Sequence, residues 1–202
     1  MVVRNSFFLF LSMFLFSCGG KKCDSKEELI QYISDESNGY RFKKTIQGVD
    51  FIVQYKPTDV LVKQEIDEMK DFNEIEKLRK KYNKFMYFDL SMSANNQELL
   101  SNVVAEKAKF GQMVTDLAFK MDEKVHLFTK DNDTLDMSDF IYPRMYGLTN
   151  STNIMIVYPR DKKYLKEEYL NLTVEDLGCN TGEVKFKLNS KQIINEPQLI
   201  FQ

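Results

Sequence analysis

The sequence has no tryptophan, a single histidine and only three cysteines among its 202 residues. One histidine excludes a multi-histidine metal centre. A Ser-His-Asp hydrolase would need His126, and no G-x-S-x-G motif accompanies it. Glycine and proline are also scarce, at 8 and 4 residues, which excludes a collagen-like or low-complexity chain. The glycines are too scattered for a P-loop or a dinucleotide fingerprint, so no cofactor is expected.

Neither sign of charge dominates, since 28 Lys and Arg stand against 30 Asp and Glu, a formal net charge of −2. Such a surface has no steering field for polyanions, so no nucleic-acid partner is expected. A hydrophobic content of 43% and a charged content of 29% are typical of an ordinary globular chain.

Long hydrophobic runs are absent except at the start of the chain. After Arg4, the segment 6–16 reads SFFLFLSMFLF, an apolar run interrupted only by serines. A membrane-spanning helix needs about 20 apolar residues, and this run has roughly half that number. Its length after a basic start is typical of the core of a signal peptide.

The residues that end this run, Leu15-Phe16-Ser17-Cys18, resemble the lipobox of bacterial lipoproteins. The resemblance implies a signal peptide over 1–17, diacylglycerol on the Cys18 thiol, and acylation of the new amine by a fatty acid such as palmitate. Several acyl chains on one residue give a stable membrane anchor, whereas one chain holds only marginally. The alternative is a secreted protein cleaved nearby, in which Cys18 is an ordinary cysteine.

Position +2 of the lipobox is Gly19 rather than aspartate. In lipoproteins of Gram-negative bacteria aspartate there retains the protein at the inner membrane, so the resemblance implies the outer membrane and leaves the face open. Residues 18–25 are expected to form a lipidated tether. Cys23 and Cys179 have two interpretations in the oxidising envelope: a disulfide that clamps the tether, or two unpaired thiols, which is slightly preferred.

The remaining residues, 26–202, are expected to form a single α+β domain, with an antiparallel sheet packed against two or three helices that lie mainly in the N-terminal half. The capping-box pattern Ser25-Lys26-Glu27-Glu28 predicts a helix that ends at Asn38-Gly39. Another helix is expected to begin at Asn95 or Asn96 and to stop at Gly111. A terminal helical turn is expected over 190–195, and strands are expected over 40–46, 49–55, 85–92, 113–120, 125–129, 134–142, 153–158, 169–174 and 183–188.

An amphipathic helix is predicted to open at Pro57 and to run to Tyr82. Its apolar residues recur about every 3.3 positions, below the 3.6 of a straight helix. Either the apolar stripe winds around the helix, or the helix breaks near Asp71.

The most unusual loop is the segment 140–153, FIYPRMYGLTNSTN. It holds Tyr142, Arg144 and Tyr146, and both residue types are enriched at binding hot spots. Loops on a rigid sheet often carry binding residues, so these three side chains are the predicted binding site. The alternative is a strand end followed by an ordinary polar loop.

Two other clusters have simpler interpretations. Asp131, Asp133 and Asp136 lack the EF-hand glycine and the distal glutamate, so we interpret them as a solvated hairpin tip rather than a weak calcium site. His126 is expected to be a solvent-facing or half-buried strand residue. No metal site is predicted.

The favoured hypothesis is a non-enzymatic, lipid-anchored envelope protein that binds another envelope protein or supports an assembly. The second is a lipid-anchored hydrolase that uses carboxylates brought together by the fold, since sequence spacing does not report such a pair. The third is a carrier for a small ligand held between sheet and helices.

Overall fold

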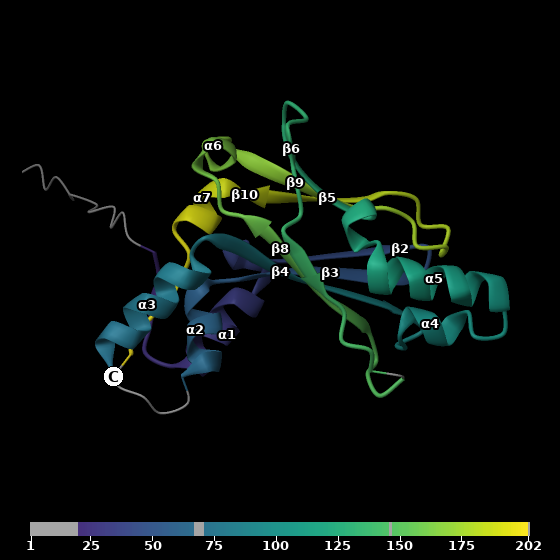
Figure 1. Ribbon diagram of the computed structural model, residues 1–202, viewed down its shortest axis with the longest axis horizontal. Helices are drawn as coiled ribbons and strands as arrows, with labels where there is room; N and C mark the ends of the chain where they lie inside the picture. Colours follow the sequence, from purple (N-terminus) through teal and green to yellow (C-terminus); the bar gives the residue numbers. More distant parts are fainter. Residues whose placement is uncertain (1–19, 67–70, 146, 202) are drawn as a thin grey trace, which may run out of the picture.

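The computed structural model describes residues 20–66, 71–145 and 147–201, and within them the chain has an α+β fold (Figure 1). The strands form a five-stranded sheet, a four-stranded sheet and a two-stranded pair. The α+β prediction is confirmed. The predicted signal peptide, Cys18 and Gly19 lie outside the described residues.

The five-stranded sheet is antiparallel, with the order β2-β3-β4-β8-β7. Gln47 and Gly48 both have positive φ, 50° and 76°, as the tight turn between the first two strands requires. The four predicted strands at 40–46, 49–55, 85–92 and 153–158 are confirmed. The members of this sheet are β2 (Arg41–Ile46), β3 (Val49–Lys56), β4 (Phe85–Ala94), β8 (Thr152–Pro159) and β7 (Asp139–Ile141).

The four-stranded sheet, also antiparallel, has the order β10-β9-β5-β6. The sequence predicted one strand over 134–142, but the chain changes sheets there, because β6 pairs with β5 whereas β7 pairs with β8. The prediction of a single antiparallel sheet is therefore wrong, because these strands divide between a five-stranded and a four-stranded sheet. The strands of the second sheet are β5 (Val125–Thr129), β6 (Thr134–Leu135), β9 (Tyr169–Val174) and β10 (Val184–Asn189).

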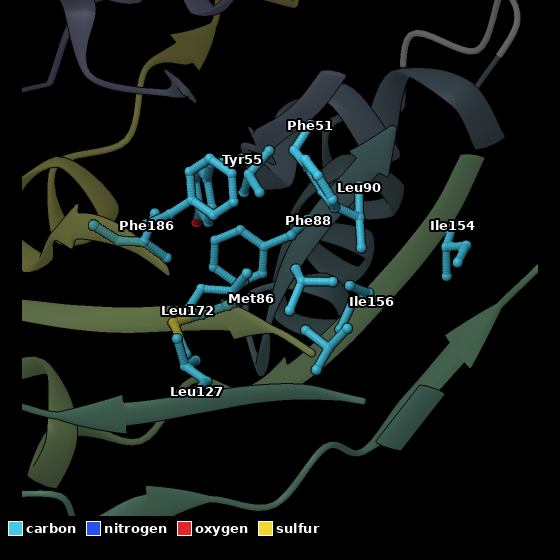
Figure 2. Packing of buried hydrophobic residues seen from close by; sticks show 14 of the residues in the cluster. Phe51, Tyr55, Met86, Phe88, Leu90, Leu127, Ile154, Ile156, Leu172 and Phe186 are labelled. Atoms are coloured by element: carbon cyan, nitrogen blue, oxygen red, sulfur yellow. The ribbon is translucent and has the colours of Figure 1, made fainter. Parts of the chain in front are cut away.

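The two sheets bury a common hydrophobic core between them, as Figure 2 shows. The Tyr158 hydroxyl of one sheet donates a hydrogen bond to the Val125 carbonyl of the other, at 2.9 Å. Each large side chain buried in this way contributes about 1.5–3 kcal/mol relative to its exposed state. The labelled contributors are Phe51, Tyr55, Met86, Phe88, Leu90, Ile154 and Ile156 from the five-stranded sheet, and Leu127, Leu172 and Phe186 from the four-stranded sheet.

The first helix, α1 (Lys26–Ser34), is capped as the sequence predicts. The Ser25 hydroxyl accepts from the Glu28 backbone N–H at 3.1 Å, and the Glu28 carboxylate accepts from the Asp24 N–H at 2.8 Å. A 3₁₀ turn, η1 (Glu36–Asn38), follows and ends at Gly39 in the left-handed conformation. Leu29 and Ile33 are buried, so the predicted apolar face packs inward.

The predicted tether is shorter than expected, because Lys22–Cys23 form β1, which pairs in parallel with β11 (Gln198–Leu199). The two ends of the described chain therefore lie together. Pairing with a strand 176 positions away has no local signature, which is why the sequence indicated only a tether.

The amphipathic stretch is broken, as one of the two interpretations required, into α2 (Thr58–Glu65) and α3 (Phe72–Tyr82). The Asp71 side chain caps α3 by accepting from the Asn73 N–H at 2.9 Å. Four buried side chains form a small separate cluster between the two helices, namely Val62, Ile66, Ile75 and Leu78.

Helices are also spread through the later part of the chain, so the prediction that they lie mainly in the N-terminal half is wrong. Asn95 and Asn96 both have positive φ and form a turn, and Gly111 lies inside α5, not at its end. The segment 113–120 is largely helix, because Met113 and Leu117 are buried at a spacing of four. The later helices are α4 (Leu99–Asn102), α5 (Lys107–Phe119), η2 (Met121–Glu123), α6 (Lys162–Leu165) and α7 (Ser190–Ile194), the last of which confirms the predicted terminal turn. Within the described ranges, every helix is too short or too polar to cross a bilayer.

Cys23 and Cys179 are both free thiols in the structure, so the disulfide that would clamp the tether is not formed. Cys23 is buried on β1, and Cys179 is half-buried in the β9–β10 connection. Burial raises the pKa of both thiols and so lowers the fraction of reactive thiolate.

Alkylation of the folded protein without reductant is expected to modify Cys179 first and Cys23 only after unfolding, because Cys23 is the more buried thiol. Peptide mass spectrometry after iodoacetamide treatment measures both. If Cys179 resisted modification in denaturant until reductant was added, the protein would contain the disulfide instead.

Candidate functional site

The predicted binding loop lies between β7 and β8 and forms one wall of a groove with a volume of about 380 Å³. Tyr142 and Arg144 both line this groove, as the sequence predicted for a binding site. Tyr146, the third predicted residue, lies outside the described residues. The opposite wall comes from the α4–α5 region, and the full lining is Glu98, Leu100, Ser101, Val104, Phe110, Val114, Tyr142, Arg144 and Gly147.

A buried carboxylate, Glu98, holds the loop in place at the start of α4. It accepts from the Gly147 N–H at 3.1 Å and from the Thr149 hydroxyl at 2.7 Å. Gly147 has φ = +79°, a backbone conformation that glycine adopts without strain. A second tie links the walls, because the Leu99 N–H donates to the Thr152 hydroxyl at 3.0 Å. These hydrogen bonds fix the two walls of the groove to each other.

Sequence reasoning missed Glu98, whose partners lie about fifty positions away along the chain. Buried carboxylates are rare unless they are paired. A glutamate beside Leu99 and Leu100 gives no local signal of burial, so only the fold identifies it.

Four apolar side chains, Leu100, Val104, Phe110 and Val114, line the groove, and all of them are at least partly exposed. Val104 is 67% exposed, while Phe110 and Val114 lie four positions apart on one side of α5. Leu148, next to the groove-lining Gly147, is 83% exposed. Exposed apolar side chains gathered around a groove mark binding surfaces more often than ordinary surface does.

Arg144 supplies the free positive charge of the groove. It forms no ion pair with any carboxylate in the described parts of the chain. The only carboxylate in the lining, Glu98, is occupied by the loop. A guanidinium beside an apolar groove can bind a carboxylate or carbonyl through two parallel hydrogen bonds. The groove therefore offers one apolar subsite and one anion-binding group.

The other residues considered from the sequence lie elsewhere. His126 is half-buried on β5, as expected, with Nε2 3.2 Å from Glu175 Oε1. Asp131 and Asp133 lie in the β5–β6 hairpin, which confirms the predicted turn, and Asp133 pairs with Lys163 at 3.6 Å. In the ranges that the structure describes, no three His, Cys, Asp or Glu side chains come together as a group able to hold a metal ion.

The three carboxylates that line one small pocket each form an ion pair with an arginine. Asp59, Glu76 and Glu196 line this pocket together with Arg79, which pairs with Asp59 and Glu76. Glu196 pairs with Arg160, which lies outside the lining of that pocket. Each of these carboxylates thus has an arginine as its counter-ion. The arrangement is that of structural ion pairs.

No family model, no curated protein and no solved structure matches the chain. The site must therefore be interpreted from its own chemistry.

Proposed function

We propose that the protein is a non-enzymatic bacterial lipoprotein, anchored to the outer membrane through Cys18, that binds another envelope protein in the groove between the α4–α5 region and the 142–148 loop. The groove supports the proposal of partner binding, and the resemblance of residues 15–18 to a lipobox supports the proposal of a lipid anchor. Lipid anchoring confines the body to a membrane surface, which raises the effective concentration of partners on that surface.

The chemistry of the groove indicates what part of a partner it takes. An apolar side chain would fill the space between Leu100, Val104 and Phe110, and removing such exposed apolar surface from water stabilises a complex. A carboxylate or backbone carbonyl next to that side chain would accept from Arg144. The preferred partner segment thus pairs an apolar anchor with a hydrogen-bond acceptor.

Val104→Glu is expected to weaken partner capture by about tenfold, because it places a charge in the apolar subsite. Val104 is 67% exposed in the free protein, so the substitution should leave folding intact. The measurement is the yield of crosslinked partner from membranes that contain the tagged, full-length chain.

Phe72→Glu is the matched control, since Phe72 at the start of α3 is 68% exposed but lies outside the groove. Capture with this variant should equal that of the unmodified chain. Equal losses for both variants, or no loss for either, would contradict the groove as the docking site.

A small apolar ligand is the second candidate occupant. The groove volume of about 380 Å³ lies within the roughly 300–1,000 Å³ typical of small-molecule pockets. Native mass spectrometry of the full-length protein distinguishes the two, because a carrier retains a small molecule of fixed mass and a protein binder retains a polypeptide.

A further inference from the structure

A second pocket, of about 630 Å³, lies where the chain enters the folded body. Its lining includes Gly20, the first described residue, together with residues of the α6 and α7 regions. Gly20 packs closely there, since a Cβ added to it would lie 2.5 Å from the Glu196 carbonyl oxygen. Gly20, two positions after Cys18 in the sequence, is therefore fixed in the wall of this pocket.

Three cations line the pocket against one carboxylate. Arg160 has a side chain only 11% exposed and is fixed by Glu196 at 3.1 Å, by the Tyr55 hydroxyl at 3.3 Å and by the Ile193 carbonyl. Lys162 and Lys166 are exposed and pair with no carboxylate among the described residues. The excess positive charge of the pocket thus resides on two free ammonium groups one helical turn apart.

The uncharged part of the lining suits a small amphipathic anion. The side-chain amides of Asn83, Asn195 and Gln198 supply further hydrogen-bond donors, and Leu165 and Ile194 supply apolar surface. Phosphate oxygens accept hydrogen bonds from ammonium and amide donors, and the methylene groups of a glycerol backbone can lie on the apolar side chains.

The location of the pocket close to the proposed lipid anchor indicates that such an anion would come from the membrane. Two residues of extended chain span at most about 7 Å, so a lipid on Cys18 would hold Gly20 within about a nanometre of the bilayer surface. Basic residues at that distance from anionic lipids are attracted to them, and the attraction falls off within a Debye length. This step rests on the proposed lipid anchor.

We propose that the pocket lined by Gly20, Arg160, Lys162 and Lys166 binds the phosphate of an anionic phospholipid headgroup and so fixes the orientation of the body on the membrane. The lipid on Cys18 sets the distance to the bilayer, and the headgroup in the pocket sets the rotation about the tether. The docking groove lies at a separate place on the molecule, with no lining residue in common with this pocket.

Lysine acylation of the full-length chain in non-ionic detergent tests the pocket directly. Dihexanoyl phosphatidylglycerol is expected to slow acylation of Lys162 and Lys166 about fivefold and to leave Lys77 and Lys107 unchanged. Inorganic phosphate at the same concentration should protect far less. Equal protection by inorganic phosphate would overturn the lipid assignment, and unchanged rates with both probes would overturn the site.

Titration calorimetry with the same phospholipid supplies the variant test. The double variant Lys162→Gln, Lys166→Gln is expected to bind about five- to tenfold more weakly. The double variant Lys77→Gln, Lys107→Gln is the control, because both residues are exposed, bear no carboxylate partner in the described ranges and lie outside the pocket. Equal affinities for the two variants would refute the proposal. Neither experiment uses lipidation or partner capture, so its failure is separable from failure of the proposed function.

Discussion

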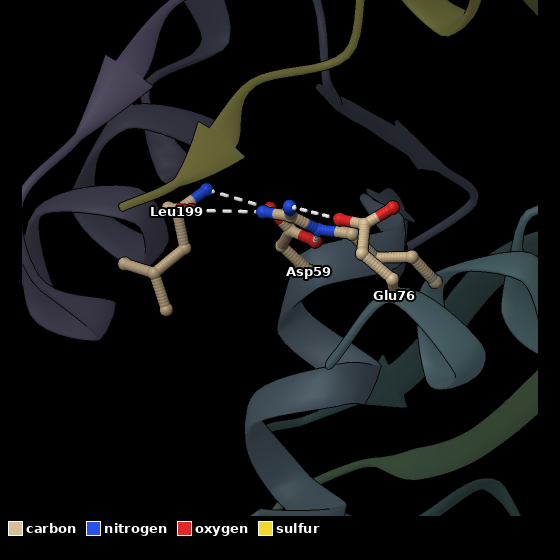
Figure 3. A network of polar contacts seen from close by, with 4 residues as sticks. Asp59, Glu76 and Leu199 are labelled. Carbon is tan, nitrogen blue, oxygen red and sulfur yellow. Dashed lines mark hydrogen bonds and ion pairs between the residues drawn. The ribbon is translucent and has the colours of Figure 1, made fainter. Parts of the chain in front are cut away.

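Replacing Asp59 with alanine is expected to lower the free energy of unfolding by about 3–5 kcal/mol. Asp59 has a side chain only 3% exposed and accepts from Arg79 Nε at 2.8 Å, from Arg79 Nη2 at 2.7 Å and from the Leu199 N–H at 2.8 Å (Figure 3). Arg79 also donates to the Leu199 carbonyl at 3.0 Å. One carboxylate thus ties α2, α3 and β11 together.

The expected loss of stability is large because Arg79 and the Leu199 N–H remain in the protein after the Asp59 carboxylate is removed. The Arg79 guanidinium remains charged after the substitution, because the ordinary pKa of arginine lies far above neutral even without a carboxylate partner. The Leu199 N–H would also lose its acceptor. Arg79 would keep Glu76 and the Leu199 carbonyl as partners but lose its buried counter-ion, and a buried N–H would lose its acceptor, which together cost more than the intact network contributes over an apolar replacement.

Urea unfolding of the full-length protein in detergent measures the change, and Glu76→Ala is the matched control. Glu76 contacts the same arginine at 3.0 Å, but its side chain is 40% exposed, so its removal should cost no more than about 1 kcal/mol. Similar losses for the two variants would show that burial does not set the strength of this network.

Replacing Cys18 with alanine is expected to leave an unprocessed precursor that incorporates no fatty acid. Thioether attachment of diacylglycerol requires the Cys18 thiol, and cleavage in lipoproteins of this type follows that attachment. Metabolic labelling with palmitate and the electrophoretic mobility of the chain give the two readouts. The loss should be complete, because no other residue at this position can accept the lipid.

Cys23→Ala is the matched control for that experiment, since Cys23 lies only five positions further along the chain but is buried on β1. It should be labelled and processed like the unmodified protein. Normal maturation of the Cys18→Ala variant, or an unlabelled native protein, would contradict the anchor and with it the proposed membrane location.

Much of the secondary structure was predictable, because its causes are local. Met86, Phe88, Leu90 and Met92 alternate with more exposed residues, and such alternation at a period of two predicts a strand with one buried face. Gln47-Gly48 predicts a tight turn, and Ser25 predicts the start of α1. The spacing of apolar residues indicated either a winding stripe or a break near Asp71, and the structure has the break. Each of these signals lies within a few positions of the feature that it predicts.

The errors fall where two local interpretations compete. The segment 113–120 has enough apolar and β-branched residues for a strand, but Met113, Leu117 and Met121 are all fully buried at spacings of four, which is the period of α5 and the turn that follows it. Likewise, the segment 134–142 contains two short strands of different sheets. Whether 113–120 is a helix or a strand, and whether 134–142 is one strand or two, depends on the surface that each segment packs against.

The sequence by itself determined the class of fold, most of the strands, the capped first helix and the loop in which Tyr142 and Arg144 would be found. It also holds the segment Leu15-Phe16-Ser17-Cys18, whose resemblance to a lipobox is a linear pattern and the basis of the proposed anchor. Long-range contacts, in contrast, determine that the strands divide into two main sheets, that Glu98 fixes the loop, that Asp59 joins three elements and that Gly20 lines one pocket with Arg160 and Lys162. These arrangements depend on contacts between residues tens to more than a hundred positions apart, and a local pattern can indicate that a residue is buried but not which distant residues bury it.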